Sequence, residues 1–428
     1  MTNLQGRFGF ATTETRVRTD GDEPRLATTI VSTLSSGRNS TVEDSISASH
    51  SSLHGAGTDI SSDKSLLPAM GELLERYCAS LYSESQFVWA SANELGRETL
   101  DLLTIPRCSD TELSSPQCPL LSADLTKAIR WVRGLCLTTG EILYIPAMLV
   151  YLSIKPESKG ERFWLPISTG CAVHQTYEEA ILSAICEIVE RDALSIMWLQ
   201  QLPIPRLCID HVPEQLECYW SRFQQSSKDI EYLFFDATTN VGIPTIYGMR
   251  TCTTNPRVAT LVSCSTSVSP LTALIKVMRD LVASAHAFRH PRPIPLGFRQ
   301  FRDVFHGATY MAARERSAAF EFLTSGTALE QLSSINSFAQ GTPKCVLKSV
   351  LTNFQKLGHR VYAVDLTTDE ALQVNMRAVR VLIPTLQPLG FWYAARFLGH
   401  SRLYEAPRAM GYRVRQEPDL NQWPQPFA

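Results

Sequence analysis

The residues of this sequence best suited to chemistry are two pairs of glutamates. One stretch reads GELLER and contains Glu72 and Glu75; another reads CEIVER and contains Glu187 and Glu190. Residues three positions apart share one face of a helix, so each pair would present two carboxylates side by side. Adjacent carboxylates repel, and burial makes the repulsion worse. Magnesium, which binds one or two carboxylates with phosphate oxygens and waters, removes this conflict. The pairs predict magnesium ions held against a triphosphate.

A single motif of this kind would have a simpler explanation. Solvated glutamates that pair with the arginine ending each motif, Arg76 or Arg191, would account for one copy. The motif occurs twice, each time after a segment rich in glycine or serine. The repetition favours a shared function and indicates the two halves of a duplicated unit.

Helices must position these glutamates. Apolar residues recur with helical spacing over residues 64–81, which contain the first motif. A second helix is predicted from Thr176, where Thr followed by Glu three residues later forms a capping box, towards Trp198, before Pro203. A third is predicted over residues 270–282.

Strands are predicted between and after these helices. Runs of β-branched and aromatic residues predict strands at residues 142–145, 148–152, 230–235, 243–247, 360–364 and 379–383, with further helices at 308–323 and 370–374. Strands and helices interleave, so the sequence predicts a mixed α/β class. Residues 1–60 are polar and rich in Ser and Thr, which predicts a linker or a loop that orders on binding; disorder is favoured for residues 32–50.

The composition excludes several classes of protein. The 428 residues include 40 basic and 42 acidic side chains, so the net charge of -2 indicates neither nucleic-acid nor anionic-membrane binding. The N-terminus lacks the apolar core of a signal peptide, and no apolar run approaches the ~20 residues of a membrane span. A soluble cytoplasmic protein is expected. The eleven cysteines contain no Cys-x-x-Cys pair, so reduced buried thiols are expected.

The order of these segments resembles the YcaO-domain family. The first ATP motif of the family is similar to residues 55–59 (GAGTD) and 71–77 (GELLERY), and the second to residues 168–172 (STGCA), 176–180 (TYEEA) and 187–193 (EIVERDA). The third family helix resembles residues 269–274 and 279–281, and the late elements resemble residues 364–367 (VDLT) and 379–384 (VRVLIP). The chain departs from the family pattern at Ala56, Ser183 and Asp280, where Lys, Gln and Glu are common.

The resemblance implies a YcaO fold, in which duplicated helix-on-sheet halves pack around an ATP and magnesium site. It implies that residues 51–428 form the YcaO domain, with residues 1–50 as a polar N-terminal segment of the same domain. The four glutamates would hold ATP through magnesium. Ser168, Ser183 and Arg191, which lie within the second motif, would join them in binding the nucleotide.

The resemblance also implies an activity, that of the azoline-forming cyclodehydratase component of ribosomal peptide natural-product biosynthesis. A Cys, Ser or Thr side chain of a precursor peptide would attack the preceding amide, whose oxygen ATP phosphorylates, giving thiazoline or oxazoline. The Pro-rich tail, with Pro424, Pro426 and the terminal Ala428, would aim its carboxylate into the active site. A separate leader-binding partner resembling ubiquitin-activating enzymes is expected, because the chain has no room for such a domain before the first motif. A flavin-dependent dehydrogenase often accompanies such oligomeric complexes.

Two alternatives remain open. The same activation of the peptide backbone serves YcaO enzymes that form thioamides or amidines with an external nucleophile. A non-catalytic scaffold that binds ATP and holds a partner would carry the same motifs.

Overall fold

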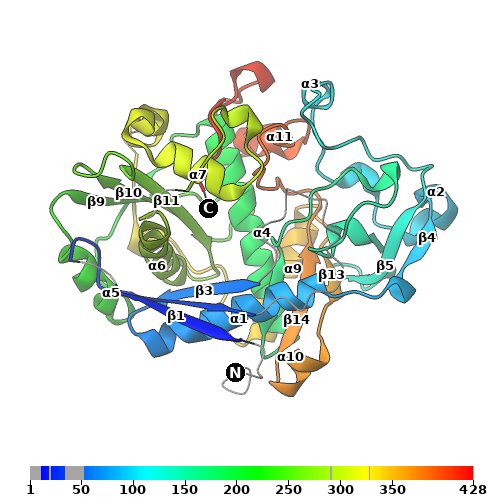
Figure 1. Cartoon of the computed structure of the whole chain (residues 1–428), viewed down its shortest axis with the longest axis horizontal. Coiled ribbons are helices and arrows are strands. Elements are labelled where there is room, and N and C mark those ends of the chain that lie inside the picture. The colour runs from blue at the N-terminus through cyan, green and yellow to red at the C-terminus, as the bar shows by residue number, and fades with distance from the viewer. Residues whose placement is uncertain (1–10, 19–20, 34–52, 290–291, 327, 428) are drawn as a thin grey trace.

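The longest helix, α4 (Tyr177–Gln200), runs through the middle of the molecule between two large sheets (Figure 1). The computed structural model describes residues 11–18, 21–33, 53–289, 292–326 and 328–427. Every residue of α4 from Asp192 to Gln200 is buried, as expected for a helix that is apolar all round and packs on every side. It contacts β14 and β7 of one sheet and β11 of the other.

The first large sheet has six strands and pairs antiparallel throughout. Its order is β4-β5-β13-β14-β7, with β6 paired to β5 on the side. The strands are β4 (Val88–Ala90), β5 (Ile129–Cys136), β6 (Ile142–Pro146), β7 (Cys171–His174), β13 (Tyr362–Asp365) and β14 (Arg377–Leu382). Strand β7 therefore joins the sheet next to a strand that comes some 200 residues later, which places the second glutamate motif beside the late VRVLIP element.

The second large sheet has five strands in the order β11-β10-β9-β8-β12, of which only the β8–β12 pair is parallel. They are β8 (Arg206–Cys208), β9 (Ile230–Asp236), β10 (Thr245–Cys252), β11 (Thr260–Thr266) and β12 (Leu329–Gln331). Helix α6 (Pro270–Ala287) packs on β10 and β11. Close packing is possible because a Cβ atom at Gly248 would lie 2.3 Å from Val277 Cγ1.

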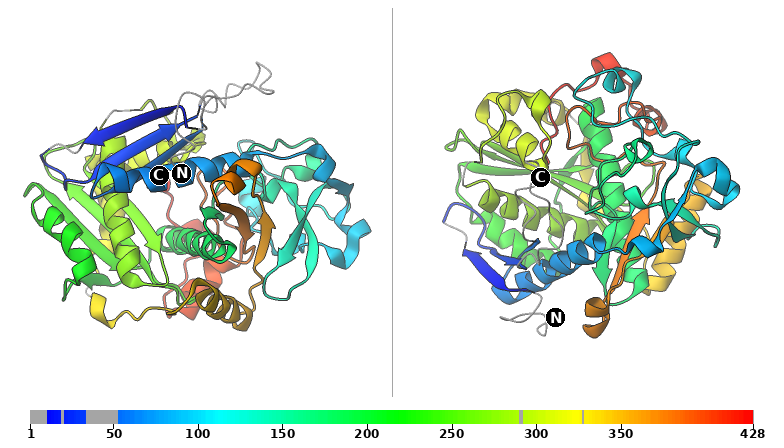
Figure 2. Two further views of the ribbon diagram at one scale, coloured as in Figure 1. Left: turned by 90° about the horizontal axis from the view of Figure 1, so that it is seen from below. Right: turned by 45° about the vertical axis from the view of Figure 1, so that its right-hand side comes forward.

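A third sheet pairs β1 (Thr13–Arg18), β2 (Ala27–Ser32) and β3 (His54–Asp59) antiparallel, and helix α1 (Ser62–Ser80) lies on β2 and β3. Seen from below, the strands of this layer lie along one edge of the molecule beside the β9–β11 sheet, and α1 extends from there towards the other large sheet (Figure 2). The remaining helices are α2 (Ala92–Leu95), α3 (Asp110–Leu113), α5 (Glu214–Gln224), α7 (Val304–Ala312), α8 (Glu321–Thr324), α9 (Pro343–Lys356), α10 (Asp369–Gln373) and α11 (Arg402–Ala409). Within the described residues, no helix combines the length and apolar character needed to cross a membrane.

The mixed α/β class and the three predicted helices are confirmed, and some local predictions are wrong. Residues 148–152 were predicted as a strand, but the chain forms a 3-10 turn at Ala147–Leu149, because an apolar run alone does not distinguish strand from other buried backbone. The helix predicted at 308–323 is broken at Ala313, where an extended residue separates α7 from a 3-10 segment. Strands β1 and β2 lie in the stretch predicted to be a polar linker or loop. Most of the segment predicted to be disordered, from residue 34 on, lies outside the described residues.

Candidate active site

The first glutamate motif is held against β3 by close packing. Cβ atoms added at Gly55 and Gly57 would lie 2.1 Å and 2.2 Å from carbonyl oxygens of α1, so only glycine lets the helix approach this strand. The Ala56 backbone N–H then donates to Glu72 Oε2 at 2.7 Å. Arg76, one turn further along α1, pairs with the other oxygen of Glu72 at 2.5 Å.

The second motif repeats this arrangement on α4. Of the predicted capping box, the Thr176 half forms: its side chain accepts from the Glu179 backbone N–H, while the Glu179 carboxylate accepts from the Thr176 hydroxyl. Gly170 has φ +89°, and a Cβ there would lie 2.4 Å from the Val381 carbonyl oxygen, so a glycine is required. Its N–H donates to Glu187 Oε2 at 2.9 Å.

Carboxylates from the two helices converge at Glu75. Burial raises the pKa of Glu75 well above its ordinary value, and the charges of Glu187 and Glu72 raise it further. Arg76 and Arg380 oppose this shift without cancelling it. Residues from α1 and α4 therefore share one electrostatic environment with an excess of negative charge.

Glu190 is the most buried of the four glutamates, with 6% of its surface exposed. Burial raises its pKa to about 7, with a further contribution from Glu187, while the charges of Arg191 and Lys276 lower it. The Thr266 backbone N–H, at the end of β11, donates to Glu190 Oε2 at 3.3 Å. A cation that reached Glu190 would favour the charged form that burial disfavours.

Three charged residues around the glutamates were given no role from the sequence. Arg380 on β14 is buried and donates to the Ile167 carbonyl at 2.7 Å, and its Nε has no hydrogen-bond partner among the described residues. Lys276 and Asp280 on α6 both act on the pKa of Glu190. Asp280 is exposed, and desolvation by the surrounding protein raises the pKa of its carboxyl against the opposing charges of Lys276, Arg279 and Arg191. Only the charge pattern of the third helix could have indicated the α6 residues, whereas Arg380 lies in the VRVLIP element that resembles the family.

The two predicted serines lie near the second motif. Ser168 is half-buried in the loop before β7, where its carbonyl accepts from the Cys171 N–H at 2.8 Å. Ser183 is half-buried on α4, one turn before Glu187 and on the same face. Both flank the carboxylates, and neither gains a more specific role from its position.

The C-terminal tail reaches this site. Pro424 and Pro426 are buried, and the Phe427 ring lies 4.4 Å from the Arg191 guanidinium carbon, in a cation–π contact. The Gln425 side chain accepts from the Phe427 N–H at 2.9 Å, which fixes the last turn of the tail. Ala428, predicted to carry the functional carboxylate, lies outside the described residues.

The residues present fit magnesium bound together with a phosphate ligand. Among the described residues, no group of three or more His, Cys, Asp or Glu side chains forms a site that could hold a metal by itself. Magnesium usually needs only one or two carboxylates, with phosphate oxygens and waters completing its ligands. Glu75 and Glu190, whose charged forms are destabilised by burial, would gain most from such a cation.

The chain belongs to the YcaO family. A family model described as "YcaO cyclodehydratase, ATP-ad Mg2+-binding" matches residues 56–387, which include all four glutamates. An uncharacterized protein in the tfuA 3′ region of Rhizobium leguminosarum bv. trifolii is 27% identical over 208 residues, 44% of this chain and 43% of that protein. An uncharacterized protein of Methanothermobacter thermautotrophicus is 22% identical over 232 residues, 54% of this chain and 56% of that protein. The chain spans about half the length of these curated relatives.

Solved structures share the fold. A heterocyclase in complex with substrate and cofactor superposes with a TM-score of 0.80 at 20% identity, covering 98% of this chain and 55% of that one. YcaO from Methanopyrus kandleri, bound with AMPPCP and Mg2+, has a TM-score of 0.63 at 16% identity and covers 89% of this chain and 86% of that one. The E. coli microcin synthetase McbBCD complex with pro-MccB17 bound has a TM-score of 0.62 at 15% identity, over 100% of this chain and 98% of that one. The fold is therefore the YcaO fold.

Proposed function

We propose that this chain is an ATP-dependent cyclodehydratase that converts Cys, Ser or Thr residues of a precursor peptide to thiazoline or oxazoline, releasing ADP and phosphate. The observation that carries the proposal is the crowding of three glutamates from two helices, Glu72, Glu75 and Glu187. Burial and the charges of Glu187 and Glu72 raise the pKa of Glu75. Family membership and the description of the family model as binding ATP and magnesium support it.

The chain's own residues would bind and position the reactants. Magnesium held by Glu72, Glu75, Glu187 and Glu190 would neutralise the charge of the triphosphate when bound. Arg191 lies 3.5 Å from Glu187 and 3.7 Å from Glu190, so its guanidinium stands where a phosphate would meet the carboxylates. Ser168 and Ser183 would line the nucleotide site.

In the proposed reaction, the peptide side chain forms a bond to the preceding amide carbon and gives up its proton. The carbonyl oxygen takes the γ-phosphoryl group of ATP, and the C–O bond breaks with loss of the amide proton, so phosphate leaves as the C=N bond forms. The proton-accepting group would be the terminal carboxylate of Ala428. The burial of Pro424 and Pro426, with the stacking of Phe427 on Arg191, supports this role because it aims the tail at the site.

The proposal includes partners and a setting. A leader-binding protein resembling ubiquitin-activating enzymes would deliver the precursor peptide, in an oligomeric complex that includes a flavin-dependent dehydrogenase where azolines are oxidised. The shared fold with the E. coli microcin synthetase McbBCD complex, which has pro-MccB17 bound, supports a multi-protein assembly acting on a peptide. We place this assembly in the cytoplasm.

Mass spectrometry with the cognate precursor, the partner protein and magnesium–ATP tests the proposal. We expect the loss of one water per ring with stoichiometric release of phosphate, and loss of both in the Glu75→Gln variant. ATP hydrolysis without ring formation in a verified cognate set would contradict the azoline assignment. Full function of Glu75→Gln and Glu190→Gln would instead indicate a scaffold.

A further inference from the structure

The carboxyl end of α4 lacks two of the backbone donors that would complete it. The last four carbonyl groups of a helix have no partner inside the helix. A donor for the Leu199 carbonyl would come from the N–H four residues later, but Pro203 has no N–H. The corresponding N–H for the Gln200 carbonyl belongs to Ile204 and donates instead to the Leu202 carbonyl at 2.9 Å. Both carbonyls therefore need donors from elsewhere in the chain.

One residue near the C-terminus, Asn421, ties the tail to this helix end. Its backbone N–H donates to the Leu199 carbonyl at 2.8 Å, and its Nδ2 donates to the Trp198 carbonyl at 3.1 Å. Its Oδ1 accepts from the Trp423 N–H at 3.1 Å, two residues further along the tail. Because only 3% of the Asn421 surface is exposed, little water is available to replace these bonds. Asn421 is therefore the anchor of the tail.

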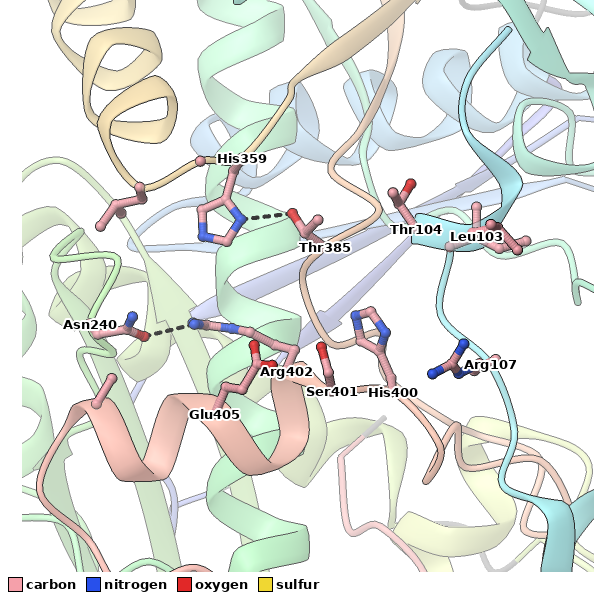
Figure 3. A pocket seen from close by; sticks show the side chains of 14 residues that line it. Leu103, Thr104, Arg107, Asn240, His359, Thr385, His400, Ser401, Arg402 and Glu405 are labelled. Atoms are coloured by element: carbon pink, nitrogen blue, oxygen red, sulfur yellow. Dashed lines mark hydrogen bonds between the residues drawn. The ribbon is translucent and has the colours of Figure 1, made fainter. Parts of the chain in front are cut away.

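The chain before the anchor is fixed to the same helix. Arg415 Nε donates to the Gln200 carbonyl at 3.0 Å and supplies its missing donor. At the start of α11, Arg402 Nη2 donates to Asp192 of α4 at 2.7 Å, and its Nη1 donates to Asn240 at 2.8 Å (Figure 3). Helix α4 therefore holds the C-terminal part of the chain at several points ahead of the tail.

Beyond the anchor, the tail runs back along α4 towards the glutamates. Trp198 Nε1 donates to the Trp423 carbonyl at 3.3 Å, and the Phe427 ring lies 4.4 Å from the Arg191 guanidinium carbon. Arg191 precedes Leu199 by about 12 Å along the helix axis, at about 1.5 Å per residue. Each residue of extended chain spans about 3.3 Å, so a shift of the tail by one residue would move its end by about a quarter of this distance.

We propose that Asn421 is the positioning residue that sets the register of the C-terminal tail against the glutamate site. This inference rests on the proposed function, in which the terminal carboxylate accepts the proton. Asn421 touches no reacting atom and acts by tying the tail to α4, the helix that carries Glu187, Glu190 and Arg191. Because the tail and these side chains share one helix as their support, the distance between them is kept when the helix moves.

Paired insertions in the full chain, assayed with the precursor peptide and the partner protein, test the proposal. One extra glycine after Gln422, beyond the anchor, should displace the end of the tail by about 3 Å and lower kcat for ring formation at least about tenfold. KM for ATP should change less than about twofold, because the glutamates keep their places. The same glycine after Arg413, at an exposed position ahead of the anchor, should leave kcat within about twofold of wild type. Equal effects of the two insertions would overturn the proposal.

Removal of the anchor gives a second test, with a readout that does not depend on activity. Asn421→Ala should speed amide hydrogen exchange in the residues after it at least about tenfold, and should lower kcat with little change in KM for ATP. Gln422→Ala, whose exposed side chain donates to the Leu420 carbonyl, should change neither. Unchanged exchange in Asn421→Ala, or faster exchange with full kcat, would overturn the proposal.

The two proposals can fail separately. Absence of ring formation by the wild type with a verified cognate set would contradict the proposed function. Hydrogen exchange would still decide the role of Asn421, since faster exchange in Asn421→Ala than in Gln422→Ala supports it and equal exchange overturns it. If Asn421→Ala does not fold, the paired insertions, which keep the anchor, give the answer.

Discussion

In the glutamate pairs on α1 and α4, the first residues, Glu72 and Glu187, make similar contacts, whereas the second residues lie in different surroundings. Glu72 and Glu187 each accept a hydrogen bond from a backbone N–H ahead of the helix, at 2.7 Å and 2.9 Å. Each also lies beside the arginine one turn later, Arg76 or Arg191. The shared geometry follows from the shared spacing and from the glycine contacts that bring strand and helix together.

The two pairs differ in the charged groups that surround their second glutamate, Glu190 or Glu75. Around Glu190, the charges of Arg191 and Lys276 lower the pKa, and Arg191 is 19% exposed beneath Phe427. Around Glu75, the nearest strong influences after burial are two further carboxylates, and Arg76 is 41% exposed. Around Glu190 the effects of Arg191 and Lys276 on the pKa exceed those of the neighbouring carboxylates, whereas around Glu75 the neighbouring carboxylates exceed Arg76 and Arg380.

The largest expected effect is on catalysis. Glu75→Gln should lower kcat by at least about 100-fold, the consequence of losing roughly 3 kcal/mol of charge stabilisation through the metal. Glu190→Gln should cost less, because Lys276 and Arg191 remain. Rates of phosphate release with precursor peptide check this order, with the exposed Glu98→Gln as a control that keeps the wild-type rate. Equal losses at Glu75 and Glu190 would remove the functional asymmetry between the halves.

Stability without nucleotide should depend on pH through Glu190. Its pKa is raised from 4.5 to about 7 in the folded protein, so the native state holds a proton that the unfolded chain has released. The free energy of unfolding should therefore fall as pH rises from about 4.5 to about 7. Above that range, Glu190→Gln should be more stable than wild type by roughly 3 kcal/mol, since one pKa unit is worth about 1.4 kcal/mol. Urea unfolding at about pH 5 and about pH 8 measures both; parallel curves for the two proteins would contradict the assignment.

The contact between β3 and α1 should be sensitive to one methyl group. Gly57→Ala should lower the free energy of unfolding by about 1–3 kcal/mol, because its Cβ would meet the Ser65 carbonyl oxygen. Gly71→Ala, inside α1 where a Cβ meets nothing, should raise it by about 0.5–1 kcal/mol. Thermal denaturation of the two variants makes a matched pair. A stabilising Gly57→Ala would show that the helix can move off the strand.

The smallest effect concerns the cover over Arg191. Phe427→Ala should weaken nucleotide binding or turnover by about two- to fivefold, the value of a cation–π contact of about 0.5–1 kcal/mol.

Deleting residues 424–428 should abolish ring formation if the terminal carboxylate accepts the proton. Steady-state kinetics of both variants check this. Full activity of the deletion variant would favour the thioamide or amidine alternative.

Much of the candidate site could be predicted from the sequence, because Glu-x-x-Glu spacing fixes which side chains share a helix face. Spacing does not predict which residues from distant parts of the chain lie at the site. Arg380 is one of two arginines in β14, and only the pairing of β14 with β7 brings it to the site. The polar sequence of β1 predicts a linker, and the segment is a strand because it pairs with β2. Strand pairing depends on a partner segment more than on local preference.

The sequence by itself determined the helices, their caps and the four glutamates, since these depend on contacts within about four residues along the chain. Tertiary structure alone decided that Glu72, Glu75 and Glu187 share one electrostatic field and that Phe427 covers Arg191. Electrostatic repulsion and burial act through space, so their magnitude is set only when the chain has brought remote segments together.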